Sequence, residues 1–161
     1  MRRIVLLSAL ILLGVAVAAG TRALAESGSS RAAGPSVSIT HFDAPVSGAL
    51  GIVLGPDRAH WFTNGDNNSI GRITTTGKIS SYRAASISNP GGIVLGPDGA
   101  LWFTNNGNDT IGRITTGGRT STYRDATISN PWGIVVGPDG ALWFTNNGND
   151  SIGRAQIVAH H

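Results

Sequence analysis

Short apolar segments alternate with polar turns from Gly51 to the end of the chain, and no segment has the 3.6-residue period of an amphipathic helix. The apolar segments are four to six residues long and rich in β-branched and aromatic residues, which favour strands. The pattern predicts four short strands in each unit, shown best by Gly51–Leu54, Ala100–Asn105, Thr110–Thr115 and Arg119–Arg124.

The segments between these strands carry turn chemistry. Gly-Pro-Asp at 55–57 becomes Pro-Asp-Gly at 97–99 and 138–140. Proline presets φ, aspartate bonds its own backbone and glycine accepts a positive φ, so each triplet predicts a tight turn. Asn106–Asp109 and Thr116–Gly118 predict two further turns in the same unit.

The units repeat at an interval of 41 residues, which Trp61, Trp102 and Trp143 show directly. Gly92–Arg113 is identical to Gly133–Arg154 at 20 of 22 positions. Four strands in about 40 residues, repeated, are typical of propeller blades. We therefore predict an all-β, β-propeller-type array of about three four-stranded blades, at about 51–91, 92–132 and 133–158.

The ends of this array raise the question of closure. Residues 37–44 resemble a fourth strand, with Phe42 where Tyr82 and Tyr123 stand, and we expect them to close the array against the three-stranded last unit. Three blades are fewer than the usual four to eight. Either two chains join head to tail as a homodimer with a six-bladed ring, or the chain is the remnant of a longer gene. The repeat identity ends abruptly after Arg154, which favours truncation, although a strand redesigned for an interface would look the same.

The first 25 residues have the pattern of a secretory signal peptide. A positive start at Met1–Arg3 precedes the apolar run Ile4–Gly20, and Ala23–Ala25 is a small-x-small cleavage site. The alternative is an uncleaved membrane anchor, for which the run is only marginally long. We expect a secreted, periplasmic or extracellular protein with no membrane attachment after cleavage. Residues 26–36 are rich in Ser, Gly and Ala and predict a flexible linker.

Charge and cysteine content narrow the function classes. The chain has 12 Lys plus Arg against 9 Asp plus Glu, but three arginines lie at positions 2, 3 and 22. Without these the charge is balanced and no basic cluster remains, so we expect no nucleic-acid partner. The absence of cysteine excludes disulfides and thiolate zinc sites.

The repeat itself resembles a known family. Gly-Ile-x-x-Gly-Pro-Asp-Gly-Ala-Leu-Trp-Phe-Thr-Asn, followed by Ile-Gly-Arg-Ile-Thr-Thr-x-Gly, is similar to the blade of virginiamycin B lyases (streptogramin lyases) across residues 37–158. The resemblance implies a seven-bladed propeller about twice as long as this chain. It also implies Mg²⁺-assisted, non-hydrolytic opening of a cyclic depsipeptide antibiotic at its ester, with a histidine as general base and acidic side chains holding the metal.

The family's catalytic residue types are missing at the matching positions. Histidine precedes the Gly-Ile pair of certain lyase blades, where this chain has Leu50, Gly91 and Trp132. Glutamate often follows Trp-Phe-Thr in the lyase, where this chain has Asn64, Asn105 and Asn146. Asparagine offers a carbonyl oxygen but no negative charge and no base at neutral pH. We therefore assign no catalytic or metal-binding residue and expect no cofactor, with Mg²⁺ required only if lyase activity exists.

The amides nevertheless suggest a binding face. In a four-stranded blade the second-to-third turn and the connection to the next blade emerge at the same end. Amides and a tryptophan around one axis suit a small polar, uncharged ligand such as a glycan or peptide; the candidates are Asn64, Asn105, Asn146, Trp132, Asn89 and Asn130. The alternative is that the asparagines cap turns and Trp132 packs beneath a loop.

Three functions follow from these observations. The leading hypothesis is a secreted, streptogramin-lyase-like propeller that acts as a binding or scaffold module. The second is an active Mg²⁺-dependent virginiamycin B lyase with a site assembled between chains. The third is an inactive gene fragment.

Overall fold

The computed structural model describes residues 34–43 and 46–158. The expected signal peptide, most of the linker and the two terminal histidines lie outside the described residues. The chain divides into two units, 1–39 and 40–161, of which the first contributes only residues 34–39 here, all exposed and without regular secondary structure. No helix of the described part is long and apolar enough to cross a membrane. The remaining description concerns the second unit.

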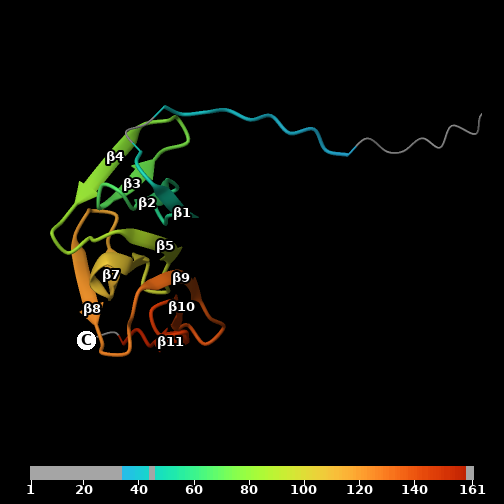
Figure 1. The fold of residues 1–161 in the computed structure, drawn as a ribbon. Coiled ribbons are helices and arrows are strands. Elements are labelled where there is room, and N and C mark those ends of the chain that lie inside the picture. The colour runs from blue at the N-terminus through green and yellow to red at the C-terminus, as the bar shows by residue number, and fades with distance from the viewer. Residues whose placement is uncertain (1–33, 44–45, 159–161) are drawn as a thin grey trace, which may run out of the picture. The chain divides into compact units, whose positions relative to one another are not determined.

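This unit consists of three antiparallel sheets of consecutive strands, which confirms the predicted propeller blades (Figure 1). The first blade is β1 (Ala49–Leu54), β2 (His60–Asn64), β3 (Ser69–Ile73) and β4 (Ile79–Arg83). The second is β5 (Pro90–Leu95), β6 (Leu101–Asn105), β7 (Thr110–Ile114) and β8 (Thr120–Arg124), with a short 3₁₀ turn at Asn106–Asn108. The third is β9 (Pro131–Val136), β10 (Leu142–Asn146) and β11 (Ser151–Ala155).

Each blade pairs a phenylalanine directly with a glycine on the neighbouring strand. Phe103 of β6 lies opposite Gly112 of β7, and a methyl group on Gly112 would overlap the Phe103 ring. The same pairing joins Phe62 to Gly71 and Phe144 to Gly153. The glycine therefore gives the ring its space, and this explains why the Trp-Phe-Thr strand is always followed by Ile-Gly-Arg.

The cores lie between the blades. Trp61, Ile70 and Ile87 from the first blade and its exit loop pack against Leu101, Phe103 and Ile114 of the second. The second blade presents the equivalent Trp102, Ile111 and Ile128 to Leu142 and Phe144 of the third. Each blade thus has a front face toward the blade before it and a back face, carrying the tryptophan, toward the blade after it.

The inner strands β1, β5 and β9 approach one another closely. Thr63 Oγ1 accepts a hydrogen bond from Gly51 N and donates to Gly91 O at 2.6 Å. A Cβ on Gly51 would stand only 3.0 Å from Gly91 O. One step along the array, Thr104 makes the same bonds to Gly92 N and Trp132 O, and no side chain larger than glycine fits at position 92 without a shift.

The expected closing strand is not formed. Residues 34–43 belong to no strand, and the β9–β11 sheet has three strands. The side chain of Phe42 instead lies beside Gly77, in the β3–β4 turn of the first blade. The position of that ring matches the position of Tyr82 beside Gly118 of the second blade.

Candidate functional site

The connections between blades and the β2–β3-type turns share one end of the array, which we call the loop face. Gly107 N donates to Ser88 O and Asn106 N to Asn89 O, joining the β6–β7 turn to the loop that enters the second blade. Asn147 and Gly148 repeat these bonds one blade later. The expectation that both kinds of loop emerge together is confirmed.

Three of the six candidate binding residues are used by the fold. Asn64, Asn105 and Asn146 end the second strand of each blade and are buried. Asn105 Nδ2 donates to Thr110 Oγ1 at 2.9 Å and to Ser86 O at 3.1 Å, and its Oδ1 accepts from Ser88 N. Asn146 repeats this pattern. The amides of Asn105 and Asn146 therefore hold the entering loop against the blade, and no ligand could reach these two without displacing it.

Asn64 makes no such bond to a loop among the described residues. Its Nδ2 donates to Ser69 Oγ at 3.1 Å, but its buried Oδ1 has no hydrogen-bond partner among the described residues. Asn106, which follows Asn105 in the second blade, also has a buried Oδ1 without a partner among the described residues. The latter atom lies close to Gly91, because a Cβ on that glycine would stand 2.9 Å from it.

The other three candidates lie on the surface. Asn89 and Asn130 are exposed and adopt the left-handed conformation, with φ of 42° and 43°. Their backbone N–H groups donate to Asn68 Oδ1 and Asp109 Oδ1. Asparagine is preferred here because it tolerates this conformation better than most residues. Trp132 follows in β9 and is 37% exposed.

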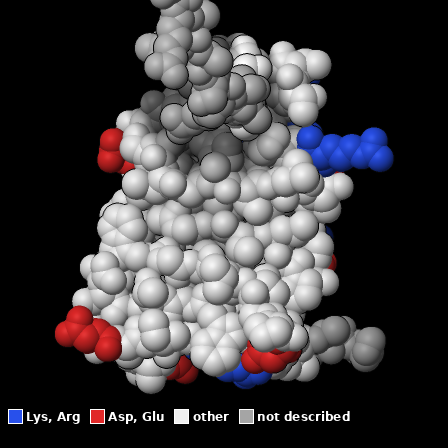
Figure 2. All heavy atoms as spheres, turned by 90° about the vertical axis from the view of Figure 1, so that its right-hand side faces the viewer, with Lys and Arg blue, Asp and Glu red and all other residues white. Residues whose placement is uncertain are grey.

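The three positions that hold histidine in certain lyase blades come together at the start of the inner strands. Leu50, Gly91 and Trp132 lie near the first residues of β1, β5 and β9, and a Cβ on Gly91 would be 3.4 Å from Trp132 O. Figure 2 views the side on which these strands lie in Figure 1, and the middle of that surface carries no charged side chain among the described residues. The arrangement can contact an uncharged ligand but supplies no base.

The residues of the described part do not fit a magnesium site. No group of three or more His, Cys, Asp or Glu side chains gathers in these ranges. Magnesium prefers carboxylate oxygens, yet the matching positions hold asparagines, and the amide oxygens of Asn105 and Asn146 already accept backbone hydrogen bonds. We derive no chemical step through a metal here.

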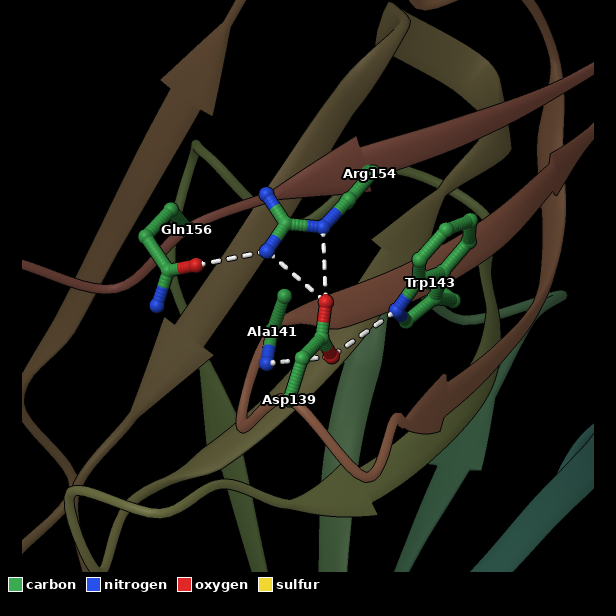
Figure 3. A network of polar contacts seen from close by, with 5 residues as sticks. All are labelled: Asp139, Ala141, Trp143, Arg154 and Gln156. Carbon is green, nitrogen blue, oxygen red and sulfur yellow. Dashed lines mark hydrogen bonds and ion pairs between the residues drawn. The ribbon is translucent and has the colours of Figure 1, made fainter.

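The sequence did not reveal a hydrogen-bond network in each blade. It joins the aspartate of the Gly-Pro-Asp turn to the tryptophan and the arginine of the same blade. In the third blade Asp139 accepts from Trp143 Nε1 at 3.1 Å and from Arg154 Nε at 2.8 Å, and Arg154 also reaches Gln156 (Figure 3). Asp57 and Asp98 make the same bonds in the other blades. The common 41-residue spacing of Asp, Trp and Arg was the signal that could have identified it.

This network sets the charge state of the aspartates. The hydrogen bond from Trp143, then those from Arg154 and the backbone of Ala141, lower the pKa of Asp139 to about 2. In Asp98, burial acts to raise the pKa, but the bonds from Trp102 and Arg113 outweigh it and the pKa is lowered. These carboxylates are paired and ionised at neutral pH, so they stabilise the blades and offer no general base.

The family model and several solved structures similar to this chain are all virginiamycin B or streptogramin B lyases. The model of the virginiamycin B lyase family matches residues 25–160. A crystal structure of virginiamycin B lyase from Staphylococcus aureus superposes with a TM-score of 0.67 at 44% identity, covering 70% of this chain and 40% of the enzyme. A catalytically inactive variant of that enzyme with quinupristin gives 0.65 at 46% identity, covering 69% of this chain and 39% of the variant.

A streptogramin B lyase structure gives a TM-score of 0.62 at 39% identity, covering 74% of this chain and 44% of that one. The chain thus spans about two fifths of the length of the structures it matches. The comparison with curated proteins found no significant match.

Proposed function

The chain belongs to the virginiamycin B lyase family, and we propose that it acts as a secreted module that binds a cyclic peptide without opening it. The ligand class rests on the similar S. aureus enzyme whose inactive variant was crystallised with quinupristin. The binding surface is the loop-face end of the inner strands, around Trp132, Gly91 and Asn130.

One observation carries this proposal: Trp132 replaces a potential base with an exposed indole at the start of β9. An indole offers a large apolar surface and one N–H donor, which suits a peptide ring that has apolar side chains and carbonyl groups. The backbone carbonyl of Trp132 and the unpartnered Asn106 Oδ1 both lie close to Gly91, within 3.4 Å of where its Cβ would stand. Charged groups are absent from the described residues here, so a ligand bound to this surface would bury no unpaired charge of the protein.

Family membership favours a second function, Mg²⁺-dependent elimination at the ester of a type B streptogramin. Leu50, Gly91 and Trp132 cannot abstract a proton, and Asn64, Asn105 and Asn146 carry no charge for a metal. This activity would therefore need a base and acidic ligands from other side chains. General-base catalysis contributes a factor of about 10² to 10⁴ in rate, so its loss would leave little turnover.

Both functions are tested with quinupristin. We expect calorimetric binding to the full-length protein, purified after processing by the host, with no change in the mass of the ligand after prolonged incubation with Mg²⁺. Trp132→Ala should weaken binding at least tenfold, whereas Trp132→Phe should retain most of it because the aromatic surface remains. Thr122→Ala, on the exposed face of β8, is the matched control and should bind as the parent does.

The outcomes separate the hypotheses. Ring opening that EDTA abolishes would contradict the binding module and establish the lyase. Absence of both binding and turnover by a folded protein would contradict both functions. The mass of the purified chain also tests export, because cleavage after Ala25 leaves Glu26 as the first residue.

A further inference from the structure

The two outermost faces of the array expose residues that are buried elsewhere in the same array. On the front of the first blade Ile52 is 67% exposed, whereas its repeat equivalent Ile93 is 7% exposed. On the back of the third blade Ile152 is 65% exposed, and its equivalent Ile111 is 1% exposed. Among the described residues no blade covers either face, although Thr40, His41, Phe42 and Val46 line the same hollow as Ile52 on the front of the first blade.

We propose that a second copy of this chain covers both faces. The back of the third blade of each copy packs on the front of the first blade of the other, so that two chains form one closed ring of six blades. The inference does not depend on whether the module binds a ligand or turns one over.

The apolar residues of the two faces match because the repeat has already built this interface twice. The second blade meets the third through Trp102, Ile111 and Val94, and the back of the third blade presents Trp143, Ile152 and Val135. The front of the second blade meets the first through Ile93, Leu101, Phe103 and Ile114. The first blade carries the equivalent residues on its front face, namely Ile52, His60, Phe62 and Ile73, of which Phe62 is already buried.

The front face is a hollow of about 690 Å³ that contains no charged side chain. His60 replaces a leucine there, so this is the least apolar of the equivalent surfaces. Packing an apolar back face on this uncharged hollow buries no unpaired charge, so the contact carries no such free-energy cost. Large exposed apolar surfaces also mark interaction sites.

Phe42 provides the most specific argument. Trp61 stacks on Tyr82 with ring centroids 5.1 Å apart, and Trp102 on Tyr123 at 5.0 Å, but Trp143 has no such partner among the described residues. Phe42 occupies the position relative to the first blade that Tyr82 occupies relative to the second: a Cβ on Gly77 would be 2.8 Å from the Phe42 ring, and one on Gly118 would be 2.7 Å from the Tyr82 ring. Head-to-tail packing therefore places Phe42 of one copy on the second copy's Trp143.

Hydrogen bonds at the inner strands also support packing of the third blade on the first blade of a second copy. Thr63 and Thr104 each donate to a carbonyl of the next blade, whereas Thr145 accepts from Gly133 N at 3.0 Å and its hydroxyl has no acceptor among the described residues. A Cβ on Gly133 would meet only Thr145, at 3.5 Å, although the equivalent atom on Gly92 would stand 2.7 Å from Trp132 O. In the ring, Thr145 donates to the second copy's Leu50 carbonyl, and Gly133 leaves space for that carbonyl.

The number of copies follows from the number of blades. Propellers typically have four to eight blades. The described residues form three blades, so two copies give six, which falls within this range. Each contact joins the back of one copy to the front of the other, and a two-fold axis relates the two contacts, so the ring closes without leaving an exposed apolar face.

The test is the solution mass of the purified full-length protein by light scattering after gel filtration. We expect a single species of twice the chain mass. Ile152→Glu on the back face and Ile52→Glu on the front face should each give a folded monomer. Thr122→Glu, an exposed position of the middle blade, is the control and should remain dimeric.

A glycine pair makes the test independent of added charge. Gly133→Ala should fold normally and shift the protein to monomer, because its methyl group meets only Thr145 in one copy but the second copy's Leu50 carbonyl in the ring. Gly117→Ala, with no neighbour closer than 3.8 Å to the added methyl group, should leave the dimer intact.

Mixing the two glutamate variants tests the direction of packing. A head-to-tail arrangement allows one intact interface between an Ile52→Glu chain and an Ile152→Glu chain, so the mixture should recover a dimer that neither forms alone. A folded monomer of the parent chain, a polydisperse assembly, or a dimer insensitive to either glutamate would overturn the proposal.

Discussion

The hydroxyl of Thr104 ties two blades together, and its removal tests how the array is held. Thr104 is fully buried, accepts from Gly92 N at 2.9 Å and donates to Trp132 O at 2.7 Å. Thr104→Val keeps the shape of the side chain and removes both bonds. A buried polar group left without a partner costs about 1 to 3 kcal/mol. With one N–H and one carbonyl affected, we expect the free energy of unfolding to fall by about 2 to 6 kcal/mol.

This is a large part of the roughly 5 to 15 kcal/mol that stabilises a typical domain. Urea unfolding followed by tryptophan fluorescence, at one protein concentration, measures the loss as a lower midpoint with an unchanged slope. Thr63→Val removes the equivalent bonds between the first two blades and should cost a similar amount.

Thr104→Ser separates the hydroxyl from the methyl group. Serine retains both hydrogen bonds and loses one methyl, worth about 0.8 kcal/mol. We therefore expect the serine variant to lie much closer to the parent than the valine variant. A valine variant within about 0.5 kcal/mol of the parent, or a serine variant as unstable as it, would refute the role of the hydroxyl; a change of that size is normal for a neutral surface substitution.

Two further predictions concern the blades themselves. Gly112→Ala should lower the free energy of unfolding by about 1 to 3 kcal/mol, because its methyl group overlaps the buried Phe103 ring. Gly117→Ala, whose methyl group enters open space, should not destabilise the protein. Equal unfolding midpoints for the two variants would contradict the pairing of phenylalanine with glycine. Asp139 should titrate at about 2 by carboxyl NMR, and Arg154→Met should raise this pKa toward its ordinary value of 3.8. Because the folded pKa lies below the ordinary one, the contribution of Asp139 to stability is fully present above about pH 4 and is lost as the pH falls through about 2; an unchanged titration in the arginine variant would count against the ion pair.

The strands and turns could be predicted from the sequence alone, because the residues within each of them favour that local structure. Strand Leu101–Asn105 is apolar and aromatic, the turn at Pro97–Gly99 has a residue suited to each dihedral angle, and the 41-residue interval repeats both. Such signals are local, so they survive without knowledge of the neighbours. The repeat, its strands and its family follow from them.

The candidate site was predicted less well, because burial depends on residues distant in sequence. Asn105 has the sequence context of a strand end facing solvent, but the loop 84–89 of the preceding connection folds over it and uses its amide. Trp132 has an equally polar context and stays exposed. Nothing in the order of residues distinguishes these two outcomes.

Thus the sequence by itself determined the strands, the turns, the blade repeat and the absence of the family's catalytic residue types at the matching positions. Only the tertiary structure decided which asparagines hold loops, which aspartates pair with arginines, and which of three nearly identical surfaces remains open. The physical reason is that identical residues have different energies when a neighbouring blade is present or absent. Trp102 is covered by the third blade and Trp143 is not, although the strands that carry them have the same sequence.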